Sequence, residues 1–170
     1  MESPLKLFHA GRKLFWLLAG SAVLADQLTK RWLYEKPVEG AGHIVHNLYL
    51  LRIVRHPGNP GGAFGLPGGP VLYAAAAVLG LALITFFFVS TPTHESRIHA
   101  GLGLMAGGAL GNLVDRVTLG VVRDFIEFPF PWPAFNVADA LICAGFGLVV
   151  WDVLVEIWPG LSGEAVDDPE

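Results

Sequence analysis

The stretch VLYAAAAVLGLALITFFFV, from Val71 to Val89, decides the fold class of this chain. It carries no charged residue along its whole length. An α-helix that crosses a bilayer requires roughly 20 consecutive, mostly apolar residues. The stretch therefore predicts a transmembrane helix over residues 71–89.

The composition of the whole chain agrees with a membrane protein of one domain. Of its 170 residues, 53% are hydrophobic and 15% are charged, whereas a soluble domain carries about 25% charged residues. The net charge is −4 and the basic residues are scattered, which excludes a nucleic-acid partner. Cys143 stands alone in an apolar run, where we expect a buried, inert thiol. No Cys/His spacing resembles a zinc site, so we expect no metal.

Three further segments predict membrane helices on either side of this stretch. Residues 98–115 and 135–157 are apolar, with charged residues near their ends. Residues 14–34 allow two interpretations, a retained membrane helix or part of a cleavable signal peptide at the start of the chain. The continuation DQLTKRWLY favours a retained helix, since Asp26 and Lys30 stand one turn apart and can pair.

The remaining segments predict a small sheet and an acidic tail. Residues 42–66 combine a weak strand signal, HIVHNLYLLRIVRHP, with the turn cluster GNPGGAFGLPGGP. We expect a single polytopic domain over residues 1–160 and a disordered acidic tail over 161–170. An even number of crossings puts both termini on one side. Lys6, Arg12 and Lys13 favour the cytoplasm, although arginines in the first and third loops weaken this assignment.

Placing an ionisable group at membrane depth costs free energy. Such a residue is therefore a candidate for function, unless an ion pair or a helix cap explains it. Four aspartates lie in or beside the predicted helices: Asp26, Asp115, Asp124 and Asp139. Structural ion pairs are a good alternative for two of them, because Asp26 has Lys30 one turn on, and Asp115 lies near Arg116 and Arg123. No comparable partner is assured for Asp124.

Asp139 and Asp124 are the best candidates for catalysis. In FNVAD, Asn136 fits the helix N-cap and Asp139 the third helical position, so a capping box is about as good an interpretation from this motif alone. The helix dipole, however, also favours an ionised carboxylate there, and Asp124 is expected to enter at similar depth. Two adjacent carboxylates share a proton. Such a pair suits an aspartic peptidase, in which one carboxylate activates water and the other donates to the carbonyl oxygen.

Other polar residues are expected at the same membrane face. GNLVDR places Asn112, Asp115 and Arg116 within two turns, where they could hold a peptide backbone or a lipid head group. Asn59 lies in the loop GNPGGAFG, where a simple turn is an equally good interpretation. The spacing of Gly103, Gly107 and Gly111 indicates a helix face that allows close packing.

Taken in order, DQLTK, NPGGAFG, GGALGNLVDR, VVRDFIEF and FNVADALI resemble the bacterial lipoprotein signal peptidases, known as signal peptidase II. The match spans Asp26 to Ile142. It implies an all-α integral membrane fold of four transmembrane helices with a small extracytoplasmic β-cradle. It also implies a multi-pass protein of the bacterial cytoplasmic (inner) membrane, with cytoplasmic termini and an active site near the extracytoplasmic face.

The implied activity is that of an aspartic endopeptidase which cuts diacylglyceryl-modified prolipoproteins just before the lipobox cysteine. Its catalytic aspartates correspond to Asp124 and Asp139. The resemblance makes Asn59, Asn112, Arg116 and Asn136 substrate-contacting residues. It makes Asp26, Lys30 and Asp115 supporting polar residues. The implied partners are diacylglyceryl-prolipoproteins, membrane lipid and the inhibitor globomycin, with no cofactor and a monomeric state.

The chain departs from the family pattern in the cradle motif, which usually reads N-x-G-A-A-F. Here Gly62 replaces the first alanine, and HPG is inserted between Arg55 and Asn59. These departures leave the position of Asn59 open.

Two other classes of function remain compatible with the residues. In a small transporter or proton channel the aspartates would form a relay, but a relay distributes its acids across the bilayer midplane, and here they gather at helix ends. In an assembly factor the aspartates would only pair and cap, and Asp139→Asn would then be tolerated.

Overall fold

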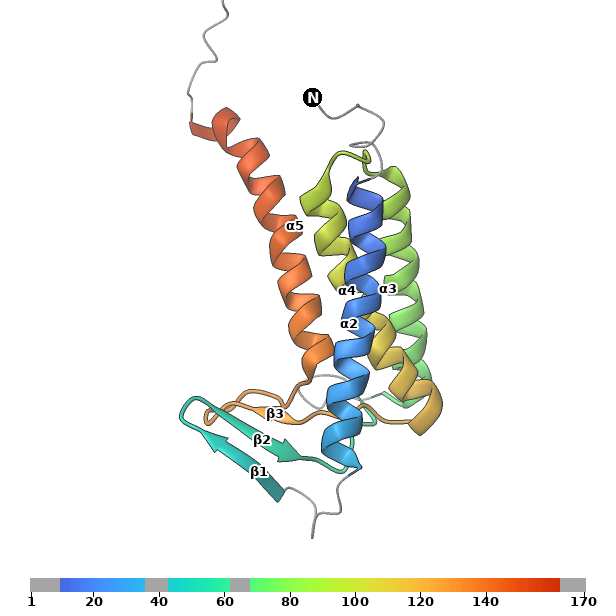
Figure 1. Cartoon of the computed structure of the whole chain (residues 1–170), viewed down its shortest axis with the longest axis vertical. Coiled ribbons are helices and arrows are strands. Elements are labelled where there is room, and N and C mark those ends of the chain that lie inside the picture. The colour runs from blue at the N-terminus through green and yellow to red at the C-terminus, as the bar shows by residue number, and fades with distance from the viewer. Residues whose placement is uncertain (1–9, 36–42, 62–67, 163–170) are drawn as a thin grey trace, which may run out of the picture.

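The structure, a computed structural model, describes residues 10–35, 43–61 and 68–162. These residues form four long helices with a three-stranded sheet at one end of the bundle (Figure 1). The helices are α2 (Ala10–Tyr34), α3 (Pro70–Ser90), α4 (Ser96–Leu119) and α5 (Val137–Ser162). The strands are β1 (His43–Leu48), β2 (Leu51–Arg55) and β3 (Ile126–Glu127). The predicted helical class with a small sheet is therefore confirmed.

Several helix ends differ from the expected ranges, and two of these differences have an identifiable reason. α4 continues past residue 115 to Leu119 and ends at Gly120, whose φ of 74° is the left-handed conformation that glycine adopts at a helix end. α5 begins after Asn136, which caps it. Of the expected tail 161–170, residues 163–170 lie outside the described part of the chain, as do residues 62–67 of the predicted cradle and Lys6.

α4 lies at the centre of the bundle and packs against α2, α3 and α5. Its glycines allow this contact. A Cβ atom on Gly107 would lie 2.5 Å from the Ala19 carbonyl oxygen of α2, and a Cβ atom on Gly108 would lie 2.5 Å from the Ala138 carbonyl oxygen of α5. The predicted face of Gly103, Gly107 and Gly111 is the face that meets α2.

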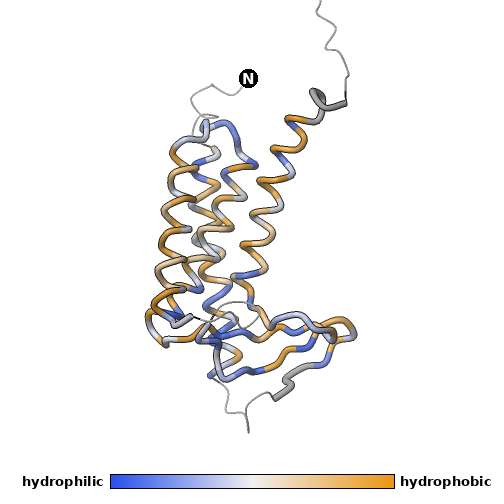
Figure 2. The backbone as a smooth tube through the Cα atoms, turned by 180° about the vertical axis from the view of Figure 1, so that it is seen from behind, coloured by the Kyte–Doolittle hydropathy of each residue, from blue (hydrophilic) through white to orange (hydrophobic). Residues whose placement is uncertain are grey.

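Many large hydrophobic side chains on the outside of the bundle are exposed, and hydrophobic residues extend along the helices (Figure 2). Val71, Leu79 and Phe86 of α3 are 80%, 72% and 63% exposed. Among the described residues, α3 and the part of α5 from Val137 to Ile157 are long and apolar enough to cross a membrane. Exposure of apolar side chains to water is unfavourable, so helices with so little buried surface fit a lipid environment.

The sheet is ordered β1-β2-β3 with antiparallel pairing, and it lies at the end of the bundle opposite the start of α2 (Figure 1). Two isolated bridges extend it: Asn59 pairs with Val122, and Ile126 pairs with Phe135. The sheet therefore holds the segment between α4 and α5, which contains Asp124, against the end of the bundle.

Candidate active site

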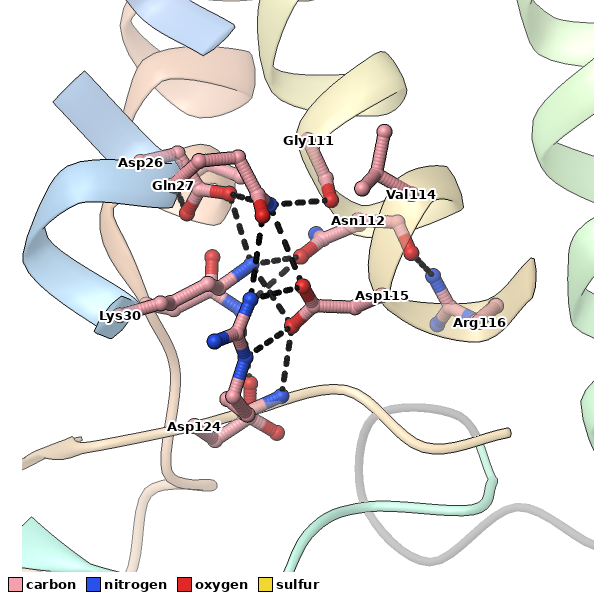
Figure 3. Close-up of polar contacts among 12 residues, drawn as sticks. Asp26, Gln27, Lys30, Gly111, Asn112, Val114, Asp115, Arg116 and Asp124 are labelled. Carbon is pink, nitrogen blue, oxygen red and sulfur yellow. Dashed lines mark hydrogen bonds and ion pairs between the residues drawn. The ribbon is translucent and has the colours of Figure 1, made fainter. Parts of the chain in front are cut away.

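A buried polar cluster fills the space where α2 and α4 end and α5 begins (Figure 3). Lys30 is fully buried, and its Nζ donates to Asp26 Oδ2 at 2.8 Å and to Asn112 Oδ1 at 3.0 Å. The same Nζ lies 3.3 Å from Asp115 Oδ2. The predicted pair of Asp26 and Lys30 is confirmed, and it belongs to a larger group of three acceptors around one cation.

Asp115 is held by Arg123 rather than by the adjacent arginine. Arg123 donates to it three times, from Nη2 at 2.6 Å, from Nε at 3.2 Å and from its backbone N–H at 3.0 Å. Gln27, which the sequence did not single out, donates to Asp115 Oδ1 at 3.1 Å and accepts from Arg123 at 3.0 Å. Gln27 was present in the motif DQLTK, but no spacing rule distinguishes it from a solvent-facing glutamine.

The start of α5 forms a reciprocal capping box. Asn136 Oδ1 accepts the backbone N–H of Asp139 at 3.1 Å, and Asp139 Oδ2 accepts the backbone N–H of Asn136 at 3.1 Å. Asp26 Oδ1 accepts a further N–H from Ala138 at 3.1 Å. The capping interpretation of Asp139 is therefore correct, but capping uses only one of its two carboxylate oxygens.

The structure brings Asp124 and Asp139 together through Asn136. Asn136 Nδ2 donates to Asp124 Oδ1 at 2.8 Å, while its backbone N–H is bonded to Asp139. Asn112 Nδ2 donates to Asp139 Oδ1 at 2.7 Å, and Asn59 Nδ2 donates to Asp124 Oδ2 at 3.1 Å. Each of the four carboxylate oxygens thus accepts one N–H from the protein.

Asp124, in the segment between α4 and α5, has a perturbed pKa. Burial, and to a lesser extent the negative charge of Asp139, raise its pKa to about 6 against the hydrogen bonds from Asn59 and Asn136, which lower it. A carboxyl group with this pKa gains and loses its proton near neutral pH, as a general acid or base must.

The position of Asn59, which the sequence left open, follows from the turn formed by His56, Pro57 and Gly58. Gly58 has φ of 105°, and a Cβ atom there would lie 2.6 Å from Val121 Cγ2. The backbone of Asn59 then pairs with Val122 in both directions, at 2.8 and 2.9 Å. This turn therefore docks against the segment before Asp124 and directs the Asn59 amide to the carboxylate.

Asp124 and Asp139 line one cavity of about 500 Å³. Arg116 also lines it, with its guanidinium 5.8 Å from the ring centre of Tyr73. Much of the remaining wall is apolar, with Phe128, Trp132, Ile142 and Cys143. The expectation of a buried Cys143 is wrong, since this thiol is exposed and lines the cavity. An apolar run in a membrane helix can face lipid or a cavity, so apolar neighbours do not imply burial.

Comparisons with known proteins relate the chain to one family. A family model described as "Signal peptidase (SPase) II" matches residues 18–155. A lipoprotein signal peptidase from Pelotomaculum thermopropionicum is 35% identical over 141 residues, which cover 82% of this chain and 90% of the relative. One from Burkholderia mallei is 34% identical over 159 residues, which cover 91% of this chain and 96% of the relative.

Two solved structures of bacterial membrane enzymes share the fold. One, determined by the in meso method at 2.3 Å resolution, is 26% identical and aligns with a TM-score of 0.75 over 91% of this chain and 92% of its own. The other, determined at 1.9 Å resolution, is 29% identical and aligns with a TM-score of 0.72 over 81% and 90% of the two chains.

Proposed function

Because the chain belongs to the signal peptidase II family, we propose that it removes the signal peptides of diacylglyceryl-modified prolipoproteins by cutting before the lipobox cysteine. The family is one of aspartic peptidases of the membrane. The observation that supports this function in the present chain is the convergence of Asp124 and Asp139, from different elements, on one cavity through Asn136.

In the proposed mechanism Asp124 and Asp139 hold one proton between them. The ionised carboxylate takes a proton from the attacking water, and the protonated one donates to the oxygen of the scissile carbonyl. A carboxylate oxygen has two lone pairs, and each oxygen here gives one of them to an N–H of the protein. The second lone pairs are left for the water and the shared proton.

Asn112 links the catalytic pair to the buried cation. Its Oδ1 accepts from Lys30 Nζ and from Asn136 Nδ2, both at 3.0 Å. An amide oxygen that receives two donors fixes the orientation of the whole side chain, so Nδ2 must face Asp139. In this way Lys30, held by Asp26 and Asp115, acts as a supporting residue that orients Asn112 without touching substrate.

The same proposal places the protein in the bacterial inner membrane with four crossings and cytoplasmic termini. α2 and α4 are 25 and 24 residues long, which is sufficient to span, and Asp26, Lys30, Asn112 and Asp115 are buried inside the bundle. The site would then lie at the extracytoplasmic face, beside the sheet. There the acyl chains of the substrate can stay in the bilayer while the lipobox enters the cavity. The enzyme would act as a monomer.

Asn59, Asn112, Arg116 and Asn136 would contact the substrate. Arg116 brings a positive charge to the wall of the cavity that also contains the two aspartates, where a carbonyl or ester oxygen of the lipidated segment could accept its N–H groups. Globomycin would occupy the same cavity.

The test follows cleavage of a diacylglyceryl-modified prolipoprotein by gel shift, with purified protein in nanodiscs. We expect Asp124→Asn and Asp139→Asn each to lower the cleavage rate by at least about a hundredfold, because each removes one acid–base group. Asp152→Asn is the matched control, since Asp152 also lies in α5 but pairs with Arg97 (Nη1–Oδ1, 3.3 Å).

Asparagine at position 139 can still cap α5, so this variant is expected to fold. Normal cleavage by folded Asp139→Asn would show that the residue is only a cap, and it would contradict the mechanism.

A further inference from the structure

A second cavity, of about 570 Å³, adjoins the aspartate pair and has no part in the mechanism above. Its wall consists of two loop segments, residues 56–60 and 131–134, together with Asp124. Five residues are shared with the first cavity: Asn59, Asp124, Trp132, Pro133 and Ala134. The two spaces therefore meet at one of the two catalytic carboxylates.

The two cavities differ in the elements that line them. The first cavity includes residues of α4 and α5, among them Arg116, Ile142 and Cys143. The second is lined by loop residues alone. A polypeptide cut at the pair must continue in both directions from the scissile bond. The second cavity adjoins Asp124 and is also lined by residues 56–58, Pro60 and Pro131, which do not line the first.

We propose that the second cavity binds the first residues of the mature lipoprotein, those that follow the lipid-modified cysteine, as an extended backbone. The inference rests on the proposed function. An apolar signal peptide fits beside the helices, within the depth of the bilayer. The residues after the cysteine have to leave the membrane, and the loop-lined cavity gives them a path at the end of the bundle that carries the sheet.

The wall of this cavity suits an extended peptide. Four of its residues are prolines: Pro57, Pro60, Pro131 and Pro133. Proline has a fixed φ, so this wall is rigid. Because proline has no backbone N–H, the wall offers more carbonyl acceptors than N–H donors, and these acceptors can bind the N–H groups of a substrate backbone.

The turn that forms one side of the cavity lies against β3 at one end and is hydrogen-bonded to the segment before Asp124 at the other. His56 Nε2 lies 3.1 Å from Glu127 Oε1 of β3, and the backbone of Asn59 is paired with Val122. His56, Pro57 and Gly58 thus build one wall of the second cavity, and we infer that they set a preference of this chain for the residues after the cleavage site.

The experiment compares two substrates with the same signal peptide and the same diacylglyceryl cysteine. The long substrate continues into the mature sequence, and the short one ends at the cysteine as an amide. For the wild-type enzyme we expect kcat/KM to be about tenfold lower for the short substrate, because it leaves the second cavity empty. This comparison needs no variant, so it remains decisive if a variant fails to fold.

Pro131→Trp then fills the second cavity, since Pro131 lines this cavity and is absent from the wall of the first. We expect it to lower kcat/KM for the long substrate about tenfold and to bring the ratio between the two substrates close to one. Pro129→Trp is the matched control, an exposed proline of the same loop that lines neither cavity, and it should preserve the wild-type ratio.

Equal kcat/KM for both substrates in the wild-type enzyme would overturn the inference and leave the proposed function standing. An unchanged long-to-short ratio in folded Pro131→Trp would also overturn it. Failure of the wild-type enzyme to cut either substrate would instead contradict the proposed function itself.

Discussion

Asn136 is the residue on which the geometry of the aspartate pair depends. Its Nδ2 donates to Asp124 and to Asn112, its Oδ1 accepts from the Asp139 backbone, and its own backbone N–H donates to Asp139. No hydrogen-bonding group of this fully buried side chain is left unused. One asparagine thus caps a helix and sets the relative position of the two carboxylates.

The hydrogen bond from Asn59 should set the pH range of cleavage. An N–H donor favours the ionised form of Asp124, so Asn59→Ala raises the pKa at which the pair loses its last proton. We expect the alkaline limb of the kcat/KM profile, near pH 6 in the free enzyme, to move to higher pH. A profile over pH 4–9 measures this shift. Asn47→Ala, an exposed position in β1, is the control. A limb that stays in place or moves to lower pH would contradict the assignment.

The raised pKa of Asp124 also has a consequence for stability. Its folded-state pKa of about 6 lies above the ordinary 3.8, so the folded protein binds this proton more tightly than the unfolded chain. The resulting stabilisation is complete below pH 3.8 and is lost as the pH rises through 6. Two pKa units correspond to about 3 kcal/mol at most.

We therefore expect wild type to lose stability relative to Asp124→Asn between pH 4 and pH 7, whatever constant offset the new amide adds. Thermal unfolding of both proteins in detergent at several pH values measures the difference. A difference independent of pH would show that Asp124 titrates normally.

At the scale of elements, the glycines of α4 decide how closely three helices approach. The relevant comparison is between two glycines in helix interiors. A Cβ atom on Gly107 would lie 2.5 Å from both the Ala19 carbonyl oxygen and the Ala22 Cβ atom, whereas one on Gly147 of α5 would meet no atom within 4 Å.

We expect Gly107→Ala to destabilise the protein by about 1–3 kcal/mol, because neither helix backbone can yield. Gly147→Ala should be neutral or stabilising by up to about 1 kcal/mol, because alanine favours a helix over glycine. Thermal unfolding in the same detergent compares the two variants. Equal midpoints would show that α2 and α4 are not in backbone contact.

The helices differ in polarity according to whether they contribute to the buried polar cluster. α2, α4 and the start of α5 carry the polar cluster, and α3 carries almost none of it. These patterns were visible in the sequence as charged residues at one end of apolar runs. The partners across the bundle, such as Asp26 with the Ala138 N–H, were not visible, because 112 residues separate them.

At the scale of the whole molecule, the arrangement predicts a definite topology. The β1–β2 turn and the turn between α3 and α4 lie at opposite ends of the bundle (Figure 1). Tyr49 in the first turn is 98% exposed, and His94 in the second is also exposed. In a four-crossing protein with cytoplasmic termini, these two residues face opposite sides of the membrane.

We expect Tyr49→Cys to react with a membrane-impermeant maleimide in intact spheroplasts, and His94→Cys to react only after lysis. The parent chain, which contains Cys143 alone, gives the background labelling. The reverse pattern would invert the proposed orientation, and labelling of both positions before lysis would exclude it.

The sequence by itself determined the class of protein, the number of long helices and the identity of both candidate aspartates. It could do so because apolar length, charge at helix ends and capping patterns are local properties that a chain carries wherever it folds. The pairing of Asp26 with Lys30 is local in the same sense.

Only the tertiary structure decided which side chains meet. It brought Asn59 to Asp124 through the turn before it and paired Asp115 with Arg123 instead of Arg116. It also added Gln27 to the buried cluster and exposed Cys143 in the cavity. These contacts join segments that are held in place by the sheet and by glycine-mediated packing of α4. Distances across a packed bundle depend on every helix in it, and no short stretch of sequence contains that information.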